Sequence, residues 1–148
     1  MSENRRIVKA PVEDVWAVLS DGWLYPLWVV GASRMRKVDD GWPAVGTRLH
    51  HSVGSWPLLI DDTTSVAEVE EGRRLVLTAR AWPAGEATVE IELHPATGTS
   101  SPTTEVVIRE DARKGPARLI PSALRQPPLV WRNTEALRRL AYLAERRQ

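Results

Sequence analysis

Two adjacent histidines, His50 and His51, are the strongest candidates in this sequence for acid–base chemistry or metal binding, because imidazole titrates near neutral pH. They lie in a segment that is typical of a β-strand, where neighbouring residues point to opposite faces of the sheet. The two rings therefore cannot serve one site. If Leu49 and Val53 face the interior, His51 does so too, and we expect it to act there as a general base or polar anchor. The alternative is a histidine with an ordinary structural or surface role.

A carboxylate, Glu110, is the second candidate for proton transfer. It follows Val106 and Ile108 at alternate positions of a predicted strand, so we expect it on the covered face of a sheet. A buried carboxylate requires a partner, and Arg80 and Arg132 are the candidate cations. An ordinary inter-strand ion pair is the alternative to a functional role.

Further side chains are candidates for contact with an apolar ligand. Seven tryptophans and no phenylalanine supply the large aromatic surfaces, although such rings also cap hydrophobic cores. Asn133 falls on the apolar stripe of a predicted helix, so its amide requires a hydrogen bond, and we expect the backbone to supply it. The candidate ligand-binding residues are Trp28, Trp56, Trp82, Trp131, Asn133 and Leu137.

Other kinds of chemistry lack the residues that they need. The sequence has no cysteine, so disulfides and thiolate metal sites are excluded, and no cluster has the spacing of a zinc site. Ser33, Ser52 and Ser55 do not lie in a Gly-x-Ser-x-Gly motif, and no glycine-rich phosphate loop follows a strand. We expect neither a metal site nor a nucleotide-binding site.

Composition and charge are typical of a globular protein. The 148 residues, 43% apolar and 26% charged, suit one domain over residues 1–148. The net charge is +1 with both signs interleaved, so we do not expect a nucleic-acid partner. The polar N-terminus lacks a secretion signal and no apolar run predicts a membrane helix, so we expect a cytoplasmic protein. For the oligomeric state, a homodimer is the alternative to a monomer.

The hydrophobic pattern predicts a strand, two short helices, six strands and a long helix. The first strand spans Asn4 to Lys9, and Pro11 suits the start of the first helix. The second helix lies between Trp23 and Val30. Prolines and glycines between Ala112 and Pro128 predict a non-helical connector, with the final helix starting at Leu129. The six strands are Ser33 to Val38, Thr47 to Val53, Leu58 to Val69, Arg74 to Trp82, Ala87 to His94 and Thr104 to Asp111.

These elements predict a curved antiparallel sheet closed by the final helix. A sheet that is wet on one face must bury the other, and a bent sheet around one helix leaves space for a pocket. Every second turn of such a meander lies at the same end. The turns at residues 54–57 and 82–85 would therefore share one end with the start of the final helix. We expect the pocket entrance there, near Trp56, Trp82 and Trp131.

Four segments carry a resemblance to a known family: Ile7 to Trp16, Gly41 to Thr47, Arg109 to Asp111 and Arg132 to Leu137. Through them, nearly the whole chain resembles the START-like, or SRPBCC, superfamily and its polyketide cyclase/dehydrase-like group. The resemblance implies an α+β helix-grip fold, a cavity for lipids, polyketides or aromatic metabolites, no cofactor and, in some relatives, cyclisation or dehydration. No motif here matches the catalytic sets of characterised aromatase/cyclases, so the resemblance assigns no catalytic residue.

Two functional hypotheses follow. In the first, the protein binds a hydrophobic small molecule in its cavity, with cyclase or dehydratase activity as the enzymatic version of this role. In the second, it is a protein-interaction module whose exposed tryptophans contact a partner while the cavity has no function.

Overall fold

The computed structural model describes residues 2–30, 32–53, 60–81, 85–96, 101–114 and 122–147. A strand is followed by short helices, six more strands and a long helix, which confirms the predicted order. The elements are β1 (Ser2–Val8), α1 (Val12–Leu19), η1 (Gly22–Leu24), α2 (Tyr25–Trp28), β2 (Ala32–Val38), β3 (Arg48–Val53), β4 (Ile60–Glu70), β5 (Arg74–Ala81), β6 (Gly85–Ala96), β7 (Thr103–Lys114) and α3 (Ser122–Glu145).

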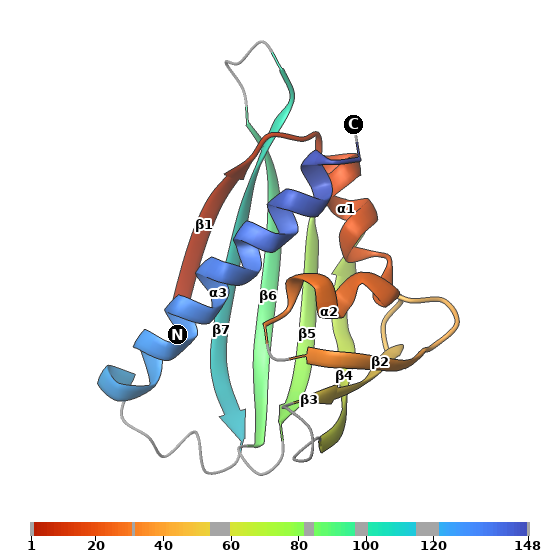
Figure 1. Ribbon diagram of the computed structural model, residues 1–148, viewed down its shortest axis with the longest axis vertical. Helices are drawn as coiled ribbons and strands as arrows, with labels where there is room; N and C mark the ends of the chain where they lie inside the picture. Colours follow the sequence, from red (N-terminus) through yellow and green to blue (C-terminus); the bar gives the residue numbers. More distant parts are fainter. Residues whose placement is uncertain are drawn as a thin grey trace.

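The strands form one antiparallel sheet in the order β1-β7-β6-β5-β4-β3-β2 (Figure 1). The first strand joins the last, with Ser2 opposite Glu110 and Val8 opposite Thr104. Register shifts in β2, in β4 and between β6 and β7 bend the sheet, because an extra residue in one strand increases the local twist. The result is the predicted helix-grip fold.

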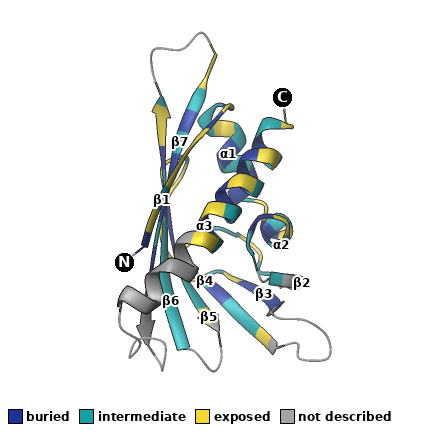
Figure 2. Cartoon of the chain, turned by 60° about the vertical axis from the view of Figure 1, so that its left-hand side comes forward, coloured by how far each residue is buried: buried dark blue, intermediate teal, exposed yellow. Residues whose placement is uncertain are grey.

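The described helices all lie on one face of the sheet, and α3 crosses that face obliquely (Figures 1 and 2). The buried stripe of α3 includes Leu137, Leu140 and Ala144, whose spacing of three and four residues places them on one side of a helix. This stripe packs into the same core as Val15 of α1 and Ile108 of β7. None of the described helices is long and apolar enough to cross a membrane.

The predicted boundary between the connector and the final helix is wrong. Strand β7 continues to Lys114, because its pairing with β6 extends to the partner Glu86. Helix α3 begins at Ser122 rather than Leu129 and includes Pro127 and Pro128. The φ angle that proline imposes is itself helical. The two prolines therefore lack the N–H groups of two backbone hydrogen bonds, but the helix continues on both sides of them.

The predicted clustering of strand ends is confirmed. Val53 pairs with Ile60 at the β3–β4 connection, and Ala81 pairs with Gly85 at the β5–β6 connection. Both pairs lie at the end of the sheet where β7 finishes, which is also the end at which α3 begins (Figure 1).

Candidate ligand-binding pocket

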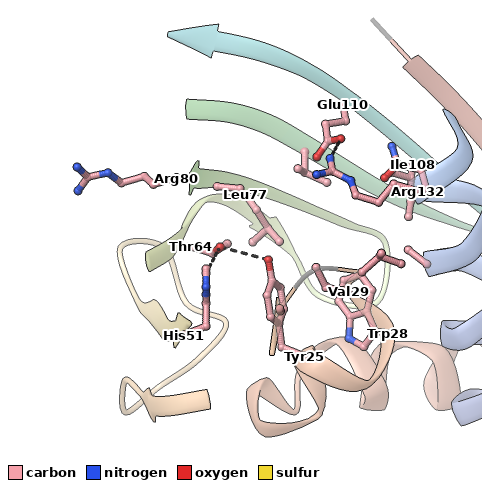
Figure 3. A pocket seen from close by; sticks show the side chains of 16 residues that line it. Tyr25, Trp28, Val29, His51, Thr64, Leu77, Arg80, Ile108, Glu110 and Arg132 are labelled. Carbon is pink, nitrogen blue, oxygen red and sulfur yellow. Dashed lines mark hydrogen bonds and ion pairs between the residues drawn. The ribbon is translucent and has the colours of Figure 1, made fainter. Parts of the chain in front are cut away.

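A pocket of about 110 Å³ lies between α2, the inner face of the sheet and α3 (Figure 3). The hollow predicted between the last helix and the sheet is therefore present. Its volume is below the roughly 300 Å³ at which ordinary ligand sites begin. It is close to an engineered apolar cavity of about 150 Å³ that binds benzene. A space of this volume fits a guest of one aromatic ring.

The walls of the pocket are mostly apolar. Trp28 and Val29 come from the region of α2, Leu77 and Ile108 from the sheet, and Ala136 from α3. Trp28 is buried, and its ring meets that of Tyr25 edge to face with centroids 5.5 Å apart. Such aromatic pairs hold both rings in fixed positions, so this wall is preorganised.

His51 lies in the lining of the pocket, as its position in the strand pattern predicts. Its residue surface is 3% exposed, and Leu49 on the same face is fully buried. His50 lies on the other face, where its Nε2 is 2.8 Å from Asp39 Oδ1. The remaining histidine, His94, is exposed and pairs with Glu92.

The surroundings of His51 keep its ring neutral. Burial lowers the pKa of His51 below its ordinary value, and the charge of Arg36 adds to this effect while that of Asp62 opposes it. Nε2 lies 2.9 Å from Thr64 Oγ1. Nδ1 is buried and has no hydrogen-bond partner within the part of the chain that the structure describes.

Glu110 of β7 and Arg132 of α3 form an ion pair in the lining of the pocket. The strand alternation correctly predicts that Glu110 is buried. Of the two candidate cations, Arg132 is its partner. Arg80 also lines the pocket, but its guanidinium points away (Figure 3) and lies 3.9 Å from both Asp62 and Glu86. The pocket therefore has a charged pair on one side and uncharged polar groups at His51 on another.

The predicted backbone partner of Asn133 is wrong, because the amide bonds to a side chain. Its Nδ2 lies 3.5 Å from Ser2 Oγ, which in turn donates to the Glu110 carbonyl oxygen at 3.1 Å. The pairing of β1 with β7 brings Ser2 opposite Glu110, so a hydroxyl from the start of the chain meets the amide on α3.

The other residues predicted to contact a ligand do not all lie in the pocket. Leu137 is part of the hydrophobic core and does not line the pocket. Trp131 is 68% exposed and is likewise not in the lining. Trp56 and Trp82 lie outside the described residues. Of the predicted tryptophans, Trp28 is the one that contacts this pocket in the described part of the chain.

Sequence reasoning did not single out Tyr25 and Thr64, two polar residues of the lining. Tyr25 lies three residues before Trp28 in the short second helix, which is a spacing that places both rings on one side. Thr64 lies two residues before Val66, so strand alternation directs both to the same face. A polar residue at a position that the pattern directs inward is the feature of the sequence that could have identified both as site residues. Within the described ranges, no group of three or more histidines or carboxylates is arranged to hold a metal ion.

Comparisons with known proteins agree with this fold. Protein NE0264 from Nitrosomonas europaea is 18% identical with a TM-score of 0.70, over 98% of this chain and 94% of that one. The di-domain ARO/CYC StfQ from the steffimycin biosynthetic pathway is 15% identical with a TM-score of 0.68, over 98% of this chain and 50% of that one. Ara h 8.0201 is 12% identical with a TM-score of 0.67, over 96% and 95%.

These TM-scores show a common fold. No curated protein matches the sequence. The family model described as polyketide cyclase/dehydrase and lipid transport matches residues 2–145. The chain therefore belongs to the polyketide cyclase/dehydrase and lipid transport family.

Proposed function

We propose that this protein binds a small apolar molecule, with an aromatic ring as its preferred body, in the pocket between α2, the sheet and α3. The observation that carries the proposal is the hollow of about 110 Å³ bounded by Trp28, Leu77 and Ala136. Removing an apolar guest from water into such a space is favourable in proportion to the surface buried. Polyketides and lipids, the ligands suggested by the family, are larger and would extend beyond this volume.

A titration with ethylbenzene, followed by calorimetry, tests this proposal. We expect saturable binding to the wild-type protein and its loss in Ala136→Leu, which places a larger side chain in the pocket. Leu27→Ala is the matched control, because Leu27 lies on α2 but is exposed, and it should bind as the wild type does. Absence of saturable binding to the folded wild-type protein would refute the proposal.

If the protein is also an enzyme, the reaction that its pocket residues suit is proton transfer. His51 is neutral and buried beside the hollow, which suits a base, and Glu110 is the carboxyl group in the lining. On this version of the function, His51→Gln and Glu110→Gln abolish turnover of a polyketide-like substrate while ethylbenzene still binds. Turnover that persists in both variants would refute these two assignments.

The second candidate is a protein-interaction module. Trp23 and Trp131 are both exposed, and tryptophan is enriched at the energetic centres of protein interfaces. A module of this kind requires no small-molecule binding. Its partner affinity would fall in Trp131→Ser and be unchanged in Ala136→Leu, which is the opposite of the pattern expected for the pocket.

A further inference from the structure

A surface groove of about 440 Å³ lies between the end of α1, the short helix η1 and the loop that joins β2 to β3, which are neighbours on the molecule (Figure 1). Its volume falls within the roughly 300–1,000 Å³ of ordinary ligand sites. The groove and the central pocket have no lining residue in common. The loop includes Gly41 to Thr47, a segment that carries the family resemblance and has no role in the proposed function. The groove is therefore a separate candidate site.

Two tryptophans line this groove and give it an aromatic wall. Trp42 of the loop is half-buried, and its Nε1 donates a hydrogen bond of 3.2 Å to the carbonyl oxygen of Leu19. That bond ties the loop to the end of α1 and holds the ring in place. Trp23 of η1 is 59% exposed. Contact of a large indole with water is unfavourable, so an occupant that covers Trp23 gains free energy.

The charged groups of the groove are all negative among the described residues. Its lining contains Asp21, Asp39 and Asp40 and no lysine, arginine or histidine. Asp39 is compensated, because its carboxylate lies 2.8 Å from His50 Nε2 and 3.4 Å from Arg48 Nε. Asp21 and Asp40 are exposed, and no basic side chain of the described residues forms an ion pair with either. Two carboxylates are therefore left to attract a cation.

The end of α1 adds to this attraction. Ala17 and Ser20 bring the C-terminal end of the helix to the groove, and the last turn of α1 contains no basic residue. The C-terminal pole of a helix dipole is negative and favours a positive charge nearby. An exposed indole also attracts a cation to the face of its ring. The tryptophan, the carboxylates and the helix end thus favour the same kind of occupant.

Arginine is the side chain that matches this combination. Its guanidinium is planar, stacks on aromatic rings and pairs with carboxylates through two N–H groups. Sites for small molecules bury most of their ligand, whereas this groove is open to solvent, so it suits a side chain that a larger molecule presents.

We propose that the groove binds an arginine-bearing segment of a partner protein, with a guanidinium between the ring of Trp23 and the carboxylates of Asp21 and Asp40. This site goes beyond the proposed function and does not depend on it. The ethylbenzene titration therefore decides the role of the pocket separately, because none of these three residues lines the pocket.

Two peptides of the same shape test the inference by NMR titration of the ¹⁵N-labelled protein. One is Gly-Arg-Gly-Arg-Gly, and in the other citrulline, which is uncharged, replaces both arginines. The indole N–H signal of Trp23 is identified by its loss in Trp23→Phe. We expect this signal to shift saturably with the arginine peptide, less so at high salt, and not with the citrulline peptide. An equal response to both peptides, or no response to either, overturns the inference.

Variants of exposed residues locate the binding without disturbing the fold. Asp40→Asn and Trp23→Ala, followed through the indole signal of Trp42, should each weaken the arginine peptide about threefold, as expected for one exposed ion pair or cation–π contact. Glu71→Gln is the matched control, because it removes the same charge from an exposed position in the turn between β4 and β5. It should bind as the wild type does.

Three results of these measurements overturn the inference. An equal loss in Glu71→Gln and Asp40→Asn would mean that the peptide responds to overall charge rather than to the groove. Unchanged affinity in both Asp40→Asn and Trp23→Ala would place the peptide elsewhere on the protein. Binding of N-acetylarginine amide as tight as that of the peptide would indicate a site for a small guanidinium compound instead of a partner segment.

Discussion

The ion pair between Glu110 and Arg132 should respond very differently to the loss of either partner. The side chain of Glu110 is 6% exposed and that of Arg132 is 38% exposed. Arg132→Met leaves a carboxylate in a buried position, which costs about 3–5 kcal/mol in such pairs. We expect a value near 3 kcal/mol, since the exposed side of Arg132 would admit water. In Glu110→Gln the guanidinium turns toward solvent, and the cost should be about 1 kcal/mol.

Urea denaturation followed by circular dichroism measures both free energies of unfolding. The double variant Glu110→Gln/Arg132→Met contains no buried charge at this position. It should therefore be about 2 kcal/mol more stable than Arg132→Met alone, which corresponds to a coupling energy of about 3 kcal/mol, the upper end of the range for residues in contact. Equal costs for the two single variants, or a double variant less stable than Arg132→Met, would refute the asymmetric burial on which the reasoning depends.

Three further predictions concern stability. The pKa of His51 is lowered in the folded state, so the unfolded state binds a proton more readily. As the pH drops below about 6.5, the stability of the wild type should therefore fall relative to that of His51→Gln, by at most about 1.4 kcal/mol per pH unit. Parallel pH profiles of stability for the two proteins would contradict this. Leu140 is fully buried and Tyr142 is exposed on the same helix, so Leu140→Ala should cost about 2–5 kcal/mol and Tyr142→Ala under about 0.5 kcal/mol by urea denaturation. A Cβ at Gly22 would lie 2.5 Å from Leu49 Cδ2, so Gly22→Ala should lower stability by about 1–3 kcal/mol, and an unchanged melting temperature would count against this packing.

Much of the fold could be predicted because it depends on local periodicity. The alternation through Val106 and Ile108 placed Glu110 on the buried face, and the same rule separated His51 from His50. These predictions require only the direction of each side chain relative to its own strand. The burial of Leu137 followed in the same way from the helical period of α3.

The partners within the site could not be predicted in the same way, because they depend on the register of distant segments. Tyr25 and Thr64 are 39 residues apart, and Asn133 and Ser2 are 131 residues apart. No local pattern determines which of these side chains meet. The start of α3 was missed for a different reason, since its prolines predict a break whose cost depends on the surrounding packing.

A crystal of the protein soaked with bromobenzene gives the most direct test of the pocket. The bromine scatters anomalously, so its position is found independently of the protein atoms. We expect a strong anomalous peak inside the space bounded by Trp28, Leu77 and Ala136. A fully soaked crystal with no peak in that space, or with peaks only at the surface beside Trp131, would contradict the assignment of a ligand-binding role to this hollow.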